Sequence, residues 1–274
     1  DSLPYPDWSD YNFFMYSDNN IPIVDSKGCV RNCEFCDVIE YWSKFQFRDA
    51  EKIFAEMQHQ IQKYNILGFD FRTSLVNGNL KQFRLLLDMM YDYNLTKKYS
   101  AEKIRWNAWF IVRSKSQHTE EMFRKMGATN ASLILGVESV VPHVRNALGK
   151  NFTNEDIDYH LEMAKKYNIQ IVLLLISGYP TETLEDYEFT RQWFKDHLAY
   201  TDTISRVVLS EPVIIPNTQL DKNAKKHKII PIADNTQYTF NQWQTESISI
   251  QQRQQYRQEL AKLCANLGYN LDWN

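Results

Sequence analysis

Six short apolar runs along the chain are each followed by a segment with the residue spacing of an amphipathic helix, and this alternation limits the possible folds. Several runs are near-continuous in Val, Ile and Leu, which is typical of strands covered on both faces. Alternating strands and helices predict an α/β fold with a parallel sheet and right-handed crossovers. The pattern does not choose between an open doubly wound sheet and a partial barrel. The expected strands are residues 21–25, 66–72, 104–112, 131–137, 170–176 and 205–209.

The helical segments are recognised by apolar positions three and four residues apart and by capping signals. Ile53, Met57 and Ile61 share one face of the first of them. Thr153 and Thr183 are each followed three residues later by an aspartate, which is the spacing of a helix-starting capping box. The expected helices are residues 50–64, 80–93, 154–167 and 250–267, with further helices beginning at Thr119 and Thr183.

We expect three parts along the chain. Residues 1–20 contain two prolines and are linker-like, residues 21–220 hold the strand–helix units, and residues 221–274 form a C-terminal helical extension packed on them. The opening is typical of an interdomain linker, which raises the hypothesis that the chain is a fragment of a longer protein. A basic stretch at residues 222–228 is interpreted as a solvated loop rather than a phosphate-binding patch.

Three of the four cysteines, Cys29, Cys33 and Cys36, lie within eight residues directly after the first predicted strand. In parallel α/β folds, active sites gather in the loops that follow the carboxyl ends of strands. Three thiolates on one loop can hold three irons of a cubane cluster. The fourth iron then has no protein ligand and can bind a substrate or cofactor, whereas a closed electron-transfer cluster normally has four cysteines.

A structural zinc site is the main alternative use of these cysteines. Zinc usually takes four ligands, often from two Cys-x-x-Cys-like pairs, and the chain has neither a second pair nor a nearby histidine. The remaining Cys264 lies in a helical pattern with apolar neighbours and is predicted to be a buried core side chain. The clustering is unlike a disulfide framework and indicates a reducing compartment.

The spacing Cys-x3-Cys-x2-Cys, with the aromatic Phe35 directly before the last cysteine, resembles the motif of the radical S-adenosylmethionine (radical SAM) superfamily. The resemblance covers roughly residues 21–215 and includes features of the cobalamin-associated and methylthiotransferase-like branch. It implies a partial (β/α)6 barrel, similar to a TIM barrel. It also implies a 4Fe-4S cluster held by Cys29, Cys33 and Cys36, with S-adenosylmethionine (SAM) as the second cofactor.

Later landmarks of the family follow in order and imply contacts with SAM. Thr73 stands where a variant Asp-x-Leu-x-Asn-Gly motif has its aspartate, and Asn77 matches the asparagine of that motif. Glu138 lies in a Gly-Val-Glu-Ser segment similar to one that contacts the ribose or methionine part of SAM, and Lys150 matches a basic residue that faces its carboxylate. The SAM-binding residues implied by the resemblance are Phe35, Thr73, Asn77, Glu138, Lys150, Ile176 and Gly178.

Two of these residues come from one further segment, and one more candidate comes from strand position alone. Ile176 and Gly178 precede Pro180 and Glu182 in a turn that resembles the family's Gly-x-Pro-x-Glu-Thr segment, whose backbone lies against adenine. Arg113 ends the third predicted strand and is expected to face the mouth of the barrel.

The resemblance implies an enzyme that reductively cleaves SAM to a 5′-deoxyadenosyl radical, which abstracts hydrogen from a substrate that the sequence does not identify. A one-electron donor such as flavodoxin or ferredoxin is the expected partner. One alternative is a fragment of a cobalamin-dependent radical SAM methyltransferase, because no cobalamin-binding domain lies within these 274 residues. Another is a non-catalytic iron–sulfur electron-transfer or zinc-binding module. Methylthiotransferases need a second cluster, for which only Cys264 remains.

Charge and hydropathy exclude other classes of function. The net charge of −3 gives no general attraction to nucleic acid or to anionic lipid. No apolar run approaches the roughly 20 residues that a membrane-spanning helix needs, and the N-terminus has no signal-peptide core. We therefore expect a cytoplasmic protein.

Overall fold

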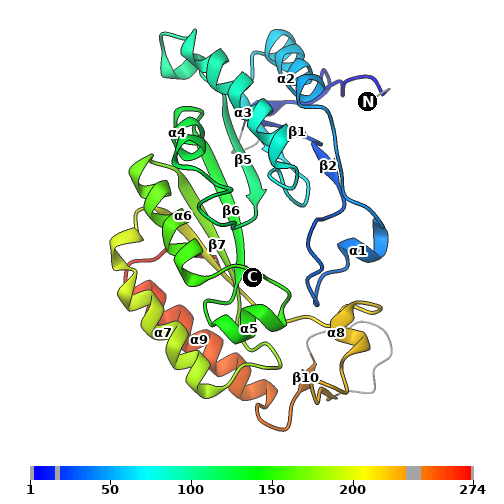
Figure 1. Ribbon diagram of the computed structural model, residues 1–274, viewed down its shortest axis with the longest axis vertical. Coiled ribbons are helices and arrows are strands. Elements are labelled where there is room, and N and C mark those ends of the chain that lie inside the picture. Colours follow the sequence, from blue (N-terminus) through cyan, green and yellow to red (C-terminus); the bar gives the residue numbers. More distant parts are fainter. Residues whose placement is uncertain (1–2, 16–18, 233–241, 273–274) are drawn as a thin grey trace.

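The computed structural model describes residues 3–15, 19–232 and 242–272 of the 274-residue chain. Its centre is a seven-stranded sheet in which all neighbouring strands are parallel (Figure 1). Six of these strands match the six predicted ones within two residues at each end. In order across the sheet, the strands are β1 (Asn20–Ile23), β4 (Gly68–Phe71), β5 (Arg105–Phe110), β6 (Ala131–Glu138), β7 (Gln170–Ile176), β8 (Ile204–Ser210) and β11 (Leu271–Asp272).

The predicted helices form, and both predicted capping boxes are present. Thr153 and Thr183 each accept a hydrogen bond from the backbone of the aspartate three residues later, and Ser249 begins a third box that the sequence reading missed. The helices are α1 (Val38–Tyr41), α2 (Ala50–Tyr64), α3 (Leu80–Leu95), α4 (Glu120–Ala128), α5 (Pro142–Ala147), α6 (Asn154–Lys166), α7 (Leu184–Asp196), α8 (Gln219–Lys222) and α9 (Ile250–Asn266).

The strand order decides between the two architectures left open by the sequence pattern. It repeats the chain order, from β1 at one edge to β11 at the other, whereas a doubly wound sheet reverses its order at an internal switch point. The helices follow the same progression, since α2 packs on α3, α3 on α4 and α4 on α6 along one side of the sheet (Figure 1). The expectation of an α/β partial barrel is therefore confirmed.

The two faces of the sheet are covered differently. Side chains directed at the helices, such as Phe69, Leu133 and Leu173, are fully buried in one continuous core. The alternate positions of β5, β6 and β7 are mostly only partly buried, so the prediction of strands covered on both faces is wrong for these strands. The inner face of the barrel is thus left accessible to a ligand, while the core lies between sheet and helices.

The predicted C-terminal extension, residues 221–274, contributes a strand as well as a helix to the barrel. α9 packs against α7, and β11 pairs with β8 as the seventh strand. The remaining short elements are the strand pairs β2 (Ser26–Lys27) with β3 (Gln46–Phe47) and β9 (Ile230–Pro231) with β10 (Trp243–Gln244), and the 3-10 turns η1 (Phe13–Met15), η2 (Ser100–Glu102) and η3 (Leu198–Tyr200). Among the described residues, no helix is both long and apolar enough to cross a membrane.

Candidate functional site

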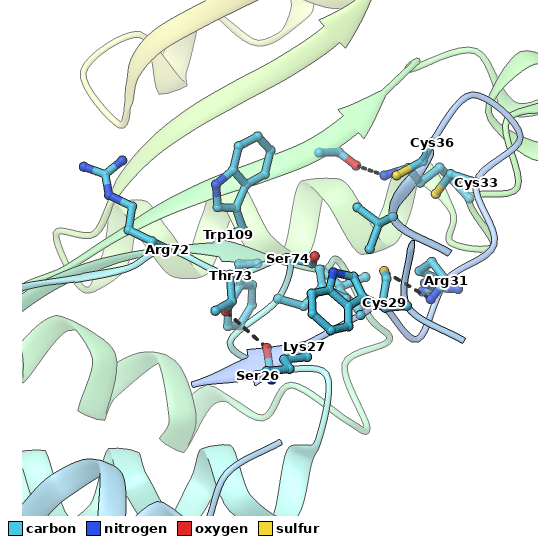
Figure 2. A pocket seen from close by; sticks show the side chains of 18 of the residues that line it. Ser26, Lys27, Cys29, Arg31, Cys33, Cys36, Arg72, Thr73, Ser74 and Trp109 are labelled. Atoms are coloured by element: carbon cyan, nitrogen blue, oxygen red, sulfur yellow. Dashed lines mark hydrogen bonds between the residues drawn. The ribbon is translucent and has the colours of Figure 1, made fainter. Parts of the chain in front are cut away.

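A cavity of about 650 Å³ lies where the carboxyl ends of β1, β4, β5 and β6 meet the loop that carries the cysteines (Figure 2). Seven of the residues predicted from the sequence line it, although they come from four separate segments of the chain. These are Cys29, Cys33, Cys36, Phe35, Thr73, Glu138 and Lys150. Asn77, Ile176, Gly178 and Arg113 are not among its lining residues.

The cysteine loop is held close to two other loops. Gly28 has a φ of +75°, and a Cβ there would lie 2.7 Å from the carbonyl oxygen of Lys44. Gly149 has a φ of +82°, and a Cβ there would lie 2.8 Å from the carbonyl oxygen of Asn32. Both positions need glycine for backbone conformation and for close approach. Within the loop, the backbone N–H of Cys36 donates to the carbonyl of Cys33 over 3.1 Å.

The three thiols fit an iron–sulfur cluster in number, softness and placement. They line one cavity from one short loop, and the backbone N–H of Arg31 donates to Cys29 Sγ over 3.3 Å. Burial raises the pKa of Cys33 to about 11 and also raises the pKa of Cys36, so thiolates there form when a metal takes the place of the protons. In the described part of the chain, no three His, Cys, Asp or Glu side chains converge on a single ion. A cubane does not require that, because each thiolate ligates a different iron.

Cys264 takes no part in this site. It is fully buried on α9, within the core between helices and sheet. The prediction of an apolar structural side chain is confirmed.

Glu138 and Lys150 form a buried ion pair at the wall of the cavity. Lys150 Nζ lies 3.1 Å from Glu138 Oε1 and donates to the carbonyl of Gly136 over 3.1 Å. Burial lowers the pKa of Lys150, but Glu138 and Cys33 beside it outweigh that effect and raise it overall. Glu138 has a φ of +63° at an irregularity in the β6–β7 pairing, which is a strained conformation for a residue other than glycine. Strain of this kind is concentrated at functional sites.

Thr73 connects the cavity to a buried carboxyl group that the sequence reading did not single out. Its hydroxyl donates to Asp25 Oδ1, and the Ser26 hydroxyl lies 3.1 Å from Thr73 Oγ1. Asp25 is fully buried, and burial raises its pKa to about 6 despite the hydrogen bond from Thr73. The related motif has an aspartate at the place of Thr73. In this chain a threonine occupies that place, and the carboxylate of Asp25 accepts a hydrogen bond from its hydroxyl. The only signal in the sequence was an acidic residue ending an apolar strand.

Asn77 is fully buried and uses its amide to tie the loop after β4 to the end of β5. Its Oδ1 accepts from the backbone N–H of Ile111 and its Nδ2 donates to the carbonyl of Ile111, both over 2.9 Å. Nδ2 also lies 3.1 Å from His118 Nε2. In this arrangement both hydrogens of the Asn77 amide are used within the protein, and the side chain ties the two loops together.

Two histidines complete this buried network, and their tautomers follow from their partners. His160 Nδ1 lies 2.7 Å from the carbonyl of Asp156 and must carry a hydrogen. His160 Nε2 therefore accepts from His118 Nδ1 over 2.8 Å, and His118 Nε2 accepts from Asn77. Both rings are neutral. Burial lowers the pKa of His160 to about 4, and burial together with His160, Arg113 and Arg84 lowers that of His118 further.

Acid is expected to destabilise the fold through these two rings. In the unfolded chain both histidines titrate near pH 6.5, so the unfolded state binds more protons below that pH. The two neutral rings contribute fully to the free energy of unfolding above pH 6.5. This contribution falls by up to about 1.4 kcal/mol per ring and pH unit as the pH is lowered towards 4. Urea unfolding of His160→Gln should show a smaller loss of stability between pH 7 and pH 5. His59→Gln, at an exposed position, should keep the original pH dependence; equal slopes in all three proteins would contradict the prediction.

The lining of the cavity does not include Ile176, Gly178 or Arg113. Ile176 is buried in a second apolar cluster with Val144, Leu148, Tyr179 and Leu220, against which Phe35 packs. Gly178 has a φ of +87°, and a Cβ there would lie 2.0 Å from Arg253 Cγ, so the glycine makes room for a buried arginine of α9. Arg113 donates to the carbonyl of Gly78 over 3.4 Å.

Glu34, between Cys33 and Phe35, is hydrogen-bonded to residues from the C-terminal part of the chain. Tyr179 OH donates to Glu34 Oε2, and Asn223 Nδ2 and His227 Nε2 lie 2.8 and 2.9 Å from Glu34 Oε1. The backbone N–H of Leu220 donates to the carbonyl of Glu34 over 2.7 Å. The basic stretch at 222–228, interpreted above as a solvated loop, therefore includes residues that hold the cysteine loop. Spacing along the sequence gave no sign of this contact.

A family model and several curated proteins match this chain. The family model of the radical SAM superfamily matches residues 23–194, which is more than half of the chain. An uncharacterized methyltransferase of Pyrococcus horikoshii is 23% identical over 199 residues, covering 71% of this chain and 41% of the relative. An anaerobic magnesium-protoporphyrin IX monomethyl ester cyclase of Cereibacter sphaeroides is 22% identical over 192 residues, or 68% of this chain and 30% of the relative. The chain thus spans less than half the length of these curated relatives.

Solved structures share the fold at lower identity. The radical SAM methyltransferase TsrM of Kitasatospora setae, with cobalamin and a [4Fe-4S] cluster bound, has a TM-score of 0.66 at 16% identity and covers 79% of this chain and 40% of its own. The cobalamin-dependent radical SAM enzyme OxsB, with aqua-cobalamin bound, has a TM-score of 0.66 at 14% identity, covering 90% and 41%. These likenesses show the shared barrel. The three-cysteine loop, the partial barrel and the match over residues 23–194 together establish that the chain belongs to the radical SAM superfamily.

Proposed function

We propose that this chain binds a 4Fe-4S cluster through Cys29, Cys33 and Cys36 and catalyses the reductive cleavage of SAM. The observation that carries the proposal is the single cavity lined by all three cysteines, Phe35, Thr73 and the Glu138–Lys150 pair. When bound, the cluster would supply the electron that breaks the bond between the SAM sulfur and C5′, giving methionine and a 5′-deoxyadenosyl radical. The radical would then remove a hydrogen atom from a substrate inside the barrel.

The residues of the chain would bind and orient SAM. The Lys150 ammonium is an ion-pair partner for the SAM carboxylate, and Glu138 Oε1 fixes its position at 3.1 Å. Thr73 occupies the place of the motif residue that contacts the SAM amino group. Its hydroxyl is hydrogen-bonded to Asp25 and would take that role. Phe35 supplies an apolar wall between the cluster loop and the apolar cluster that contains Ile176. Asn77 and Gly178 act as positioning residues, through Ile111 and Arg253.

Radical SAM enzymes need a one-electron donor, and we propose a flavodoxin or a ferredoxin for this role. We also place the chain in the cytoplasm, because three clustered cysteines persist as thiols only in a reducing compartment. Both assignments depend on the radical function.

Anaerobic reconstitution followed by electron paramagnetic resonance tests the radical function. A reduced-cluster signal that changes when SAM is added is expected, together with release of 5′-deoxyadenosine under dithionite. A cluster signal indifferent to SAM would favour an electron carrier, and stoichiometric zinc without iron would favour a zinc module. Either of these results would refute the proposal.

A cobalamin-dependent methyl transfer is a second candidate. Two observations favour it: the relatives include methyltransferases, and the barrel superposes on two cobalamin-bound enzymes at a TM-score of 0.66. In that case the chain is the SAM-binding part of a longer enzyme. Addition of methylcobalamin to the reconstituted chain, with a search for transfer of its methyl group to a bound acceptor, separates this outcome from simple hydrogen abstraction.

A further inference from the structure

Two large tryptophans are exposed inside the cavity and have no role in holding the cofactors proposed above. Trp109 is 41% exposed and Trp42 is 48% exposed, and both line the cavity together with the cysteines. An indole left open to solvent in a concave site is a surface for another ring, because aromatic groups gain from stacking as well as from burial.

Arg72 and Trp109 form the end of the cavity furthest from the cluster loop. Phe71 pairs with Ala108 in the parallel ladder of β4 and β5, so the next residues, Arg72 and Trp109, are neighbours on the inner face. Figure 2 shows both on the opposite side of the cavity from Cys33 and Cys36, with the arginine directed away from the sulfur atoms. A group bound there would lie next to Thr73, on the side away from Cys33 and Cys36 (Figure 2).

The Arg72 guanidinium is held in place and still accessible. Asp70 forms an ion pair with it, and Asn20 Nδ2 donates to the other oxygen of Asp70 over 3.0 Å. The Asp70 side chain is 8% exposed, whereas that of Arg72 is 67% exposed. The backbone N–H of Arg72 donates to the carbonyl of Ile23 over 3.2 Å, and the carbonyl of Trp109 accepts from Val76 over 3.0 Å. Such support fixes a binding group before the ligand arrives.

The charges around the cavity favour an anion. Its charged lining residues are Lys27, Arg31, Arg72, Lys150 and Glu138, and the last two neutralise one another. Arg72 is itself paired with Asp70 through one nitrogen, but its guanidinium is largely exposed and has further N–H donors. Lys27 and Arg31 add positive charge to the lining. Arg31 neighbours Cys29 and belongs to the cluster end, while Lys27 Nζ lies 5.2 Å from the centre of the Trp42 ring. The cavity therefore places a cation beside an indole on two of its walls.

We propose that the substrate of this site is a flat, conjugated molecule that carries a carboxylate, with its ring on Trp109 and its carboxylate on Arg72. A guanidinium matches a carboxylate in shape and charge, and an indole face accepts a conjugated ring. Trp42 and Lys27 offer the same combination to a second part of the molecule. This inference rests on the proposed radical function, because it names the substrate class of the same site.

The test is calorimetric titration of the reconstituted protein with matched probes. Naphthalene-2-carboxylate and pyrene-1-carboxylate are compared with their neutral carboxamides and with cyclohexanecarboxylate, which has the charge without the flat ring. At least one aromatic carboxylate should bind about tenfold more tightly than its carboxamide and than cyclohexanecarboxylate. Arg72→Gln should remove the preference for carboxylate over carboxamide, Arg72→Lys should keep part of it, and Trp109→Leu should weaken the carboxylate and the carboxamide alike.

Arg206→Gln is the matched control, because Arg206 is likewise an exposed arginine paired with an aspartate, Asp272 at 3.0 Å, but does not line the cavity. It should keep the preference. Equal binding of carboxylate and carboxamide, absence of binding by both aromatic carboxylates, or a preference retained by folded Arg72→Gln would overturn the proposal. Release of 5′-deoxyadenosine by the unsubstituted protein is measured separately. Release without selective probe binding defeats this inference alone, and selective binding without release defeats only the radical function.

Discussion

Cys33→Ala is expected to abolish both the iron–sulfur cluster and the release of 5′-deoxyadenosine. Cys33 is the middle of the three cysteines and the most buried of them, at 7% exposure. Only two thiolates would then remain on the loop, and no cysteine outside it lines the cavity. Iron per protein after anaerobic reconstitution, and 5′-deoxyadenosine formed with dithionite and SAM, should both fall to background.

Cys264→Ala is the matched control for that variant. The Cys264 thiol on α9 is fully buried in the hydrophobic core. Its replacement should lower the free energy of unfolding by about 1 kcal/mol or somewhat more and leave the iron content unchanged. Full activity in Cys33→Ala, or an equal loss of iron in both variants, would contradict the assignment of the cluster to the loop.

Lys150→Met is expected to lower both stability and affinity for SAM. The Lys150 and Glu138 side chains are 13% and 11% exposed, and removal of one partner leaves a buried charge uncompensated. Breaking such a pair costs about 3–5 kcal/mol. The proposed partner of the SAM carboxylate is lost at the same time, so SAM binding should weaken about tenfold or more. Denaturant unfolding and a SAM titration of the cluster signal measure the two effects.

Two further variants separate stability from SAM binding. Addition of Glu138→Gln to Lys150→Met should restore part of the stability without restoring SAM affinity. Lys166→Met removes an ion pair with Glu120 whose side chains are 54% and 51% exposed, and it should change stability by less than about 1 kcal/mol. An unchanged SAM titration in Lys150→Met would remove this residue from the proposed cofactor site.

The fold could be predicted because its signals are local and repeated. Strand runs such as residues 170–176, and capping boxes at Thr153 and Thr183, depend on neighbours only a few positions away. β11 was missed because two residues, Leu271 and Asp272, have no periodicity of their own and become a strand only by pairing with β8. The choice of a barrel came from the family resemblance, since alternation alone is compatible with either winding.

The candidate site was less predictable because it depends on the direction of side chains. Trp106 and Trp109 both lie on β5, yet Trp106 is 2% exposed in the core and Trp109 is 41% exposed in the cavity. In this strand, Arg-Trp-Asn-Ala-Trp-Phe, alternation groups Trp106 with Ala108 and Phe110 and so indicates the core indole, but it does not show that Trp109 lines a cavity. Asn77 and Gly178 were recognised through motifs, but their partners Ile111 and Arg253 lie far along the chain and decide their roles.

The hydrogen bonds of Glu34 with the C-terminal part of the chain bear on the order in which the cysteine loop folds. The partners Asn223 and His227 lie 189 and 193 positions further along, so this part of the anchoring of the cysteine loop needs nearly the whole chain. Contacts of such wide separation are formed late, because the intervening chain must be ordered first. The contacts of the loop with Lys44 and with residues 148–149 join positions closer along the chain. We therefore expect the segment 220–227 to be among the last to order around the cluster-binding loop.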